Sequence, residues 1–332
     1  MKWILGLICI GFLFTACDNT LVVTDKWKDI PIVWGFLSKS DTAHYIRVEK
    51  AFLDPNTSAY TIARIPDSLY YENAVVTLKR IASGQVFTLT RVKGEDEGYP
   101  RDSGIFAETP NYLYKIKANV IALVAGDKYE FSLQREGELA PVTAETIILP
   151  PAKLRNPNPG SLLGFKVGSP FTFAWEVVPD AGVYDLQMQF HYSEKSPSTG
   201  NIFVPLTVKW TLAEGIRNPE TSGNPGYKMV DGAEFYNTIA ANIEVDPDAT
   251  RVFQSIDIIV WCGGEELLQY NITLGANGGI TGTQDAPQYT NLSEGRGIFT
   301  SRNVSNNTGF GLTNQALEEL RNGDITGDLN FQ

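Results

Sequence analysis

The sequence predicts an all-β protein made of two sandwich domains in tandem, with short helices in the second. Three observations predict it. From Ile30 onward, apolar and polar residues alternate with the period of two that half-buried strands show. A proline-rich segment divides the chain near its middle, and the alternation resumes beyond it. The length of 332 residues suggests two domains of ordinary size.

The first domain is expected over residues 30–149. In its segment YLYKIKA, Tyr112, Tyr114 and Ile116 share one face while Lys115 and Lys117 share the other. The expected strands are 31–37, 44–50, 74–80, 86–92, 112–118, 128–134 and 142–149. About seven strands in one domain is the number expected of an immunoglobulin-like sandwich.

One local motif supports this sandwich. Leu123, Gly126 and Tyr129 have the L-x-x-G-x-x-Y spacing of a tyrosine corner. We expect the Tyr129 phenol to bond to backbone upstream of it.

Residues 150–160 are predicted to form a stiff, extended, proline-rich linker, and residues 161–332 the second domain with a C-terminal extension. Trp175 followed by Pro179, Ala181 and Tyr184 resembles strands B and C of a fibronectin type III module. The strands expected here are 171–175, 184–192, 206–212, 255–262 and 267–274.

Three further elements are expected in the second domain. Residues 233–242 predict a short helix, and a second helix begins at a Thr313 cap and ends at Gly323. Residues 295–301 predict a strand that packs back on the second domain.

The beginning of the chain predicts export. Lys2 and the apolar stretch 3–16 are typical of a signal peptide, and the stretch is shorter than the roughly 20 residues of a membrane span. Thr15-Ala16-Cys17 after Leu13-Phe14 resembles a bacterial lipobox. That resemblance implies cleavage after residue 16, lipidation of Cys17 and a tether over residues 17–29, with plain secretion or a retained anchor as the alternatives.

The net charge restricts the class of partner. Loss of Lys2 with the signal would leave 26 basic against 38 acidic residues, a net charge of −12. This balance argues against a nucleic acid as the main partner.

Cys9 lies in the signal and Cys17 at the anchor, so Cys262 would be the remaining thiol, expected as a buried small side chain.

The mature chain resembles a group of uncharacterised Bacteroidota lipoproteins that carry a domain of unknown function. The similarity lies in framework segments: IPIVWGFLSKSDTAHYIRVEKAFL, IPDSLYYENAVVTL, GDKYEFSL, YTNLSEGRGIFTSR and LNF near the end. The resemblance implies an outer-membrane lipoprotein, exposed at the cell surface, with immunoglobulin-like domains and an association with TonB-dependent uptake systems. It implies no catalytic residues.

No catalytic or metal-binding motif stands out. The two histidines, His44 and His191, are expected to be exposed on strands, and the acidic segments 94–98, 246–250 and 323–330 lack the spacing of a known calcium loop. We therefore expect no metal ion and no cofactor.

Aromatic side chains are the better candidates for ligand contact. Trp175, Trp210 and Trp261 lie in alternating strands and are expected in the core. The candidate contacts are the tyrosines expected in loops, Tyr60, Tyr70, Tyr71, Tyr99, Tyr227 and Tyr289. Thr42 and Ser68 follow aspartates in short segments that resemble Bacteroidota O-glycosylation acceptors.

The leading hypothesis is a non-enzymatic lipoprotein of the outer membrane that binds a ligand, such as a glycan, or docks on an outer-membrane protein. The first alternative is a polysaccharide-degrading hydrolase with paired carboxylates. The second is an adhesin or structural spacer.

Overall fold

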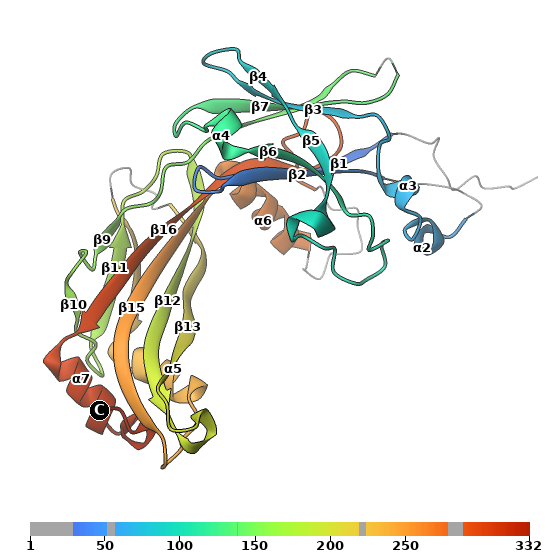
Figure 1. Ribbon diagram of the computed structural model, residues 1–332. Coiled ribbons are helices and arrows are strands. Elements are labelled where there is room, and N and C mark those ends of the chain that lie inside the picture. Colours follow the sequence, from blue (N-terminus) through green and yellow to red (C-terminus); the bar gives the residue numbers. More distant parts are fainter. Residues whose placement is uncertain (1–28, 52–56, 138, 219–223, 278–287) are drawn as a thin grey trace, which may run out of the picture.

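The computed structural model describes residues 29–51, 57–137, 139–218, 224–277 and 288–332, and it is built mainly from β-sheet. The all-β prediction is confirmed in this form, with sheets packed face to face as in a β-sandwich. Two separate tandem immunoglobulin-like domains are not confirmed, because one large sheet runs through both halves of the molecule (Figure 1).

The large sheet has nine strands. Eight follow the order β13-β12-β15-β16-β1-β2-β6-β5, and β10 pairs with β16 beside that path. The strands are β1 (Pro31–Leu37), β2 (Ala43–Lys50), β5 (Thr90–Lys93), β6 (Tyr112–Lys117), β10 (Leu162–Leu163), β12 (Ala181–Lys195), β13 (Val204–Arg217), β15 (Thr250–Gly264) and β16 (Arg296–Leu312).

A four-stranded sheet of order β4-β3-β7-β8 completes the upper half in Figure 1. Its strands are β3 (Val75–Arg80), β4 (Val86–Thr88), β7 (Lys128–Gln134) and β8 (Val142–Ile147). Alternating burial follows the predicted period of two: in β7, Tyr129, Phe131 and Leu133 are fully buried between exposed or half-buried neighbours. The short helices α2 (Ala59–Ile62), α3 (Pro66–Leu69) and α4 (Ala118–Ile121) lie in the connections.

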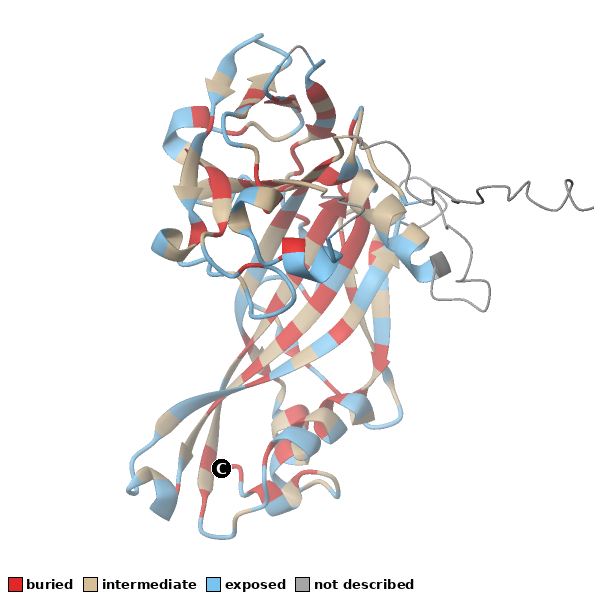
Figure 2. Ribbon diagram, turned by 90° about the vertical axis from the view of Figure 1, so that its right-hand side faces the viewer, coloured by how far each residue is buried: buried red, intermediate tan, exposed pale blue. Residues whose placement is uncertain are grey.

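A three-stranded sheet of order β14-β11-β9 completes the lower half. It consists of β9 (Leu154–Asn156), β11 (Pro170–Trp175) and β14 (Gly226–Asp231). Three longer helices are α5 (Gly232–Asn242), α6 (Glu265–Asn277) and α7 (Asn314–Asn322). The core lies between this sheet and the long strands, where buried and exposed residues alternate (Figure 2), and α5 and α7 contribute to it.

Two tyrosines tie loops to the two cores. The Tyr129 hydroxyl accepts a hydrogen bond from the Val124 backbone N–H at 3.3 Å, so the expected bond of this phenol to upstream backbone is present. In the lower half, the buried Tyr184 hydroxyl accepts from the Val178 N–H at 2.8 Å and its ring lies 5.5 Å from that of Trp175. Each bond satisfies a polar hydrogen that burial would otherwise leave unpaired.

The prediction of a strand over 267–274 is wrong, because this segment lies in α6. Its apolar residues alternate from Leu268 to Leu274, but Leu267, Leu268 and Ile272 also fit a helical face. Glu265 and Glu266 in the first turn favour the helix through its dipole. The Tyr270 ring meets that of Trp34 on β1 edge to face at 5.2 Å, so α6 covers the angle between the two halves (Figure 1).

The strand predicted at 295–301 exists, but the prediction that it packs on the second half is wrong. It begins β16, and Ile32 to Leu37 of β1 pair in parallel with residues 296–301. Phe299 is fully buried in the upper core, 5.5 Å from the Phe131 ring. The rest of β16 pairs with β15, so a strand of 17 residues serves both halves.

The segment predicted as a linker contributes to the lower half. Within residues 150–160, β9 pairs with β11, and Ala152 and Leu154 are buried in the lower core. The helix predictions at 233–242 and 313–323 are confirmed by α5 and α7, and the Thr313 hydroxyl accepts from the Ala316 N–H at 3.3 Å as a cap.

Replacing Gly297 by Ala tests the junction between β16 and β1. Gly297 has φ +97°, and an added Cβ would lie 2.0 Å from the Val33 carbonyl oxygen. Gly309 on the same strand has φ +80° but no heavy atom within 4 Å of such a Cβ. We expect Gly309→Ala to cost about 1–2 kcal/mol of unfolding free energy, from its φ alone, and Gly297→Ala clearly more. Denaturant unfolding measures both, and equal losses would contradict the close pairing of β16 with β1.

Candidate functional site

Two of the six predicted tyrosines, Tyr70 and Tyr71, line one cavity of about 560 Å³ in the upper half. We call it the tyrosine cavity. Its lining residues are Asp29, Lys50, Asp67, Tyr70, Tyr71, Glu72, Arg91, Tyr112, Arg135, Glu136 and Leu139. They come from the start of the described fold, the ends of β2 and β7, the segment around α3, and strands β5 and β6.

One wall of the tyrosine cavity is a stack of aromatic rings and a guanidinium. The Arg91 guanidinium lies 3.7 Å from the centre of the Tyr112 ring, within the range of a cation–π contact. Its Nη1 also donates to the Glu72 carbonyl at 3.1 Å. The Tyr70 and Tyr112 rings meet edge to face at 5.1 Å. The ring orientations are therefore fixed before any ligand arrives.

A buried ion network forms another part of the lining. The Arg135 side chain is only 2% exposed and donates to Asp29 at 2.7 Å and to Glu294 at 2.9 Å. The Tyr71 hydroxyl donates to the other Asp29 oxygen at 2.8 Å. Burial, followed by the bond to Asp29, raises the pKa of Tyr71 well above its usual value, so the phenol stays neutral. Both carboxylates thus pair with the Arg135 guanidinium, and Asp29 also holds Tyr71 in place.

The other predicted contact residues lie apart from this cavity. Tyr60 on α2, Tyr99 after the Gly94–Glu97 turn and Tyr227 on β14 are exposed, and the Tyr99 ring contacts that of Tyr45 at 4.8 Å. Tyr289 is half-buried ahead of β16, and Tyr227 lies on a strand rather than in the loop we expected.

The predicted modification sites also differ in setting. Thr42 is exposed in the turn before β2, while Ser68 is half-buried in α3 beside the tyrosine cavity. Cys17, the predicted lipidation site, lies outside the described residues.

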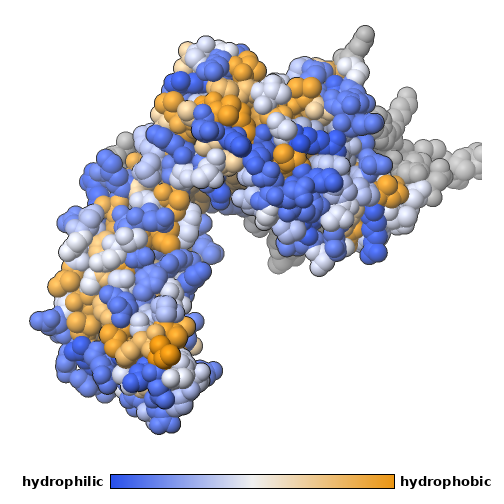
Figure 3. Space-filling model, in the orientation of Figure 1, coloured by the Kyte–Doolittle hydropathy of each residue, from blue (hydrophilic) through white to orange (hydrophobic). Residues whose placement is uncertain are grey.

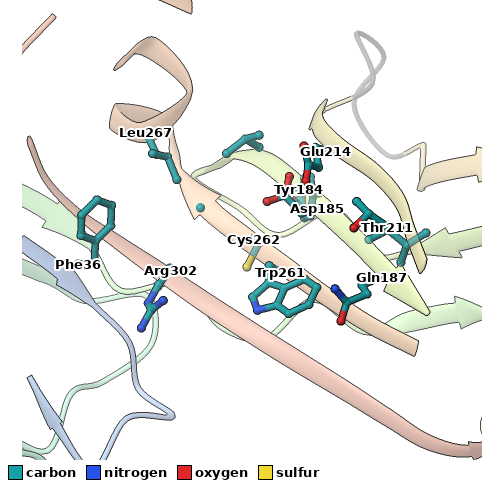
Figure 4. A pocket seen from close by; sticks show the side chains of 13 residues that line it. Phe36, Tyr184, Asp185, Gln187, Thr211, Glu214, Trp261, Cys262, Leu267 and Arg302 are labelled. Carbon is teal, nitrogen blue, oxygen red and sulfur yellow. The ribbon is translucent and has the colours of Figure 1, made fainter. Parts of the chain in front are cut away.

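Sequence reasoning missed a second cavity, which lies in the angle between the two halves and measures about 440 Å³. We call it the angle cavity. Its lining is Phe36, Val183, Tyr184, Asp185, Leu186, Gln187, Thr211, Glu214, Trp261, Cys262, Gly263, Leu267 and Arg302 (Figure 4). Trp261, expected in the core, is half-exposed and lines this cavity instead. Since its strand neighbour Cys262 is buried, alternation places Trp261 on the outer face.

Aromatic and polar groups converge in these two cavities, whereas the surface is mixed elsewhere. On the face seen in Figure 3, hydrophilic and apolar residues interleave, and apolar groups gather on both the upper and the lower half.

The Cys262 thiol is buried, as expected. Burial raises its pKa to about 11, and its sulfur lies 3.7 Å from the Pro150 carbonyl oxygen, toward which it donates. A thiol with this pKa stays protonated at neutral pH, which does not suit a nucleophile.

The described residues hold no group of three or more His, Cys, Asp and Glu side chains that could bind a metal ion. Within those same residues, no helix is both long enough and apolar enough to cross a bilayer.

Comparisons with known proteins identify no relative. No protein-family model matches the chain, and no curated protein matches it. Among solved structures, the C-terminal globular domain of an oligosaccharyltransferase from Pyrococcus abyssi aligns over 86% of this chain at 12% identity and a TM-score of 0.21. The aligned part is half of that structure's length. A similarity at this level carries no argument about fold or function.

The expectation that both histidines are exposed is wrong for His44. Its side chain lies on the buried face of β2 with Ile46 and Val48, is 2% exposed, and has no hydrogen-bond partner on either ring nitrogen. Burial lowers the pKa of His44, opposed only in part by the charge of Asp41. His191 is half-buried and bonds to Thr207 and Asp257.

His44 therefore predicts a loss of stability in acid. Its folded-state pKa lies below that of the unfolded chain, so its contribution is complete above pH 6.5 and declines as the pH falls below it. We expect the melting temperature to fall more between pH 7.5 and 5.5 in the wild type than in His44→Leu. His191→Gln leaves His44 in place and serves as the matched control. The same decline in His44→Leu and wild type would show that His44 is not the responsible group.

Proposed function

We propose that this protein is a lipid-anchored protein of the cell envelope that binds a saccharide in the tyrosine cavity without transforming it. In this proposal its two halves are immunoglobulin-like and fibronectin-like sandwiches that share the large sheet. The observation that carries the proposal is the convergence of Tyr70, Tyr71 and Tyr112 in one cavity with charged side chains of both signs.

This lining suits a saccharide for physical reasons. Sugar rings present C–H faces that pack on aromatic rings, and their hydroxyls both donate and accept hydrogen bonds. In the tyrosine cavity, Asp67 and Glu72 supply acceptors, while Lys50 and Arg91 supply donors. The volume of about 560 Å³ lies within the range of small-ligand sites.

The proposed anchor would hold this cavity near the membrane. Asp29, which lines the cavity and bonds to Arg135, is only 12 positions after Cys17 in the sequence. A fully extended tether of that length spans about 40 Å. The resemblance to Bacteroidota lipoproteins favours the outer membrane and the cell surface, with a TonB-dependent uptake system as the protein partner.

A hydrolase is the second candidate, and the acids of the same cavity favour it. Asp67, Glu72 and Glu136 all line the tyrosine cavity, and glycoside hydrolysis needs two carboxylates across one bond. Glu136 already accepts a hydrogen bond from the Asn73 N–H at 2.8 Å, which suits a structural role for that acid.

The lipid anchor is tested by Cys17→Ala. Without the thiol, the precursor should remain unprocessed and should carry no labelled palmitate. Radiolabelled or alkyne-tagged palmitate followed by gel analysis measures this. The matched control is Cys9→Ala, within the predicted signal, which should be lipidated normally. Lipid labelling that persists in Cys17→Ala would overturn the anchor.

Saccharide binding is tested with a glycan array, followed by calorimetry on the glycan that binds best. Tyr71→Ala removes an aromatic ring from the cavity lining, so the affinity should fall about tenfold, the loss of one stacking contact. Tyr71→Phe keeps the ring and should bind much more tightly than Tyr71→Ala. Tyr227→Ala, an exposed tyrosine outside the cavity, should bind as the wild type does.

Two results would count against the proposal. A protein that retains no glycan would overturn saccharide binding, as would Tyr71→Ala with unchanged affinity. Chromatography of the bound glycan after incubation separates the candidates. Intact glycan supports binding alone. Glycan that the wild type cleaves, but that Asp67→Asn or Glu72→Gln leaves intact, supports the hydrolase.

A further inference from the structure

The angle cavity is a second site, separate from the tyrosine cavity, and no residue lines both. Strands β12, β13 and β15 of the lower half supply one side of it. Phe36 of β1, Leu267 of α6 and Arg302 of β16 supply the other (Figure 4). Its shape therefore depends on how the two halves are joined.

Large apolar side chains form its walls. Trp261 lies on the outer face of β15, and Phe36 and Leu267 approach from β1 and α6 (Figure 4). Gly263 allows this approach, because a Cβ there would lie 2.6 Å from a Leu267 methyl and 3.2 Å from a Val183 methyl. The helix therefore closes against the sheet and leaves an apolar space beside Trp261.

Opposite charges stand at opposite sides of this apolar space. Arg302 lies on the side of Phe36, while Asp185 and Glu214 lie across Cys262 and Trp261 from it (Figure 4). Arg302 is 55% exposed and is paired with Asp41 at 3.5 Å. An exposed pair of this kind contributes little, so the guanidinium can turn to another carboxylate at small cost.

The acidic side is held more firmly. One Asp185 oxygen accepts from the Gly215 N–H at 2.7 Å, which fixes the carboxylate beside Glu214. Gln187, on the same face of β12, accepts from the Gln189 amide at 3.1 Å and keeps its own NH₂ as a donor. The cavity thus combines one cationic end, one anionic end and apolar walls.

We infer that the angle cavity binds a short apolar peptide with both termini free. Its carboxylate pairs with Arg302, its ammonium pairs with Asp185 and Glu214, and its apolar side chains pack on Trp261, Phe36 and Leu267. This assignment does not depend on saccharide binding at the tyrosine cavity.

Other small ligands fit this charge pattern less well. A neutral saccharide would bring no charge to either end. A fatty acid would match Arg302 but would place hydrocarbon against two carboxylates, and an apolar amine would leave the guanidinium without a partner. A zwitterion with apolar side chains satisfies both ends and the walls together.

The test is calorimetric titration of the full-length protein in detergent with the dipeptide Leu-Phe. N-acetyl-Leu-Phe removes the ammonium, Leu-Phe-amide removes the terminal carboxylate, and Gly-Gly removes the apolar side chains. Each of these should bind at least about tenfold more weakly than Leu-Phe, because each lacks one of the three matches.

Variants assign each end of the peptide to its partner. Arg302→Gln should weaken Leu-Phe about tenfold and should not weaken Leu-Phe-amide further. Asp185→Asn keeps an acceptor for Gly215, and it should weaken Leu-Phe without further effect on N-acetyl-Leu-Phe. Arg296→Gln is the matched control, since Arg296 is an exposed arginine of the same strand that bonds to Gln288 outside the cavity.

Either of two results would overturn the inference. One is the absence of binding of Leu-Phe to the wild type at about 1 mM, which would mean no useful affinity. The other is binding that Arg302→Gln and Asp185→Asn leave unchanged while circular dichroism shows all variants folded. Glycan binding at the tyrosine cavity is measured separately, so failure at one site is distinguishable from failure at the other.

Discussion

The pairing of β16 with strands of both halves is the constraint on which the rest of the structure depends. Its first part lies parallel to β1, and its second part lies antiparallel to β15. The parallel pairing joins residues more than 250 positions apart, such as Val33 and Gly297. The upper core is therefore incomplete without a segment near the end of the chain, since Leu292 and Phe299 belong to it. Such long-range pairing costs loop-closure entropy, which many local strand contacts must offset.

Strand content was predictable because alternation is a local signal. Tyr129 and Tyr184 lie on the buried faces that their neighbours indicate, and both phenols bond to backbone a few residues upstream. The partner of each strand was not predictable in the same way. Nothing local in residues 295–301 distinguishes pairing with β1 from pairing with another strand, because pairing depends on which sheet edges are open. In α6, one apolar pattern fits both periods, and the close approach permitted by Gly263 becomes visible only in three dimensions.

The residues of the candidate sites were predictable only where an aromatic side chain was expected in an exposed loop. Tyr70 and Tyr71 were identified for that reason and do line a cavity, although the expected exposure was wrong for Tyr70, which is only 5% exposed. Tyr112 and Arg91, which complete its wall, lie in alternating strands where the sequence indicates ordinary half-buried positions. Trp261 was assigned to the core because a tryptophan in an apolar strand usually packs inside, although its parity relative to Cys262 indicates the outer face. Parity within a strand was the better guide than residue type.

The two cavities differ in what holds their shape. The tyrosine cavity is bounded by Arg135, whose buried guanidinium links Asp29 at the start of the described fold with Glu294 just before β16. Removing either carboxylate would leave a buried charge with less compensation, so these three groups are expected to stay together. In contrast, the angle cavity is bounded by an exposed Arg302 with a long pair to Asp41, and by a helix that meets the sheet at glycines. The tyrosine cavity, whose shape is held by buried ion pairs, suits a ligand recognised by shape and stacking. A site with one movable charged end suits a ligand whose own charge completes the pairing.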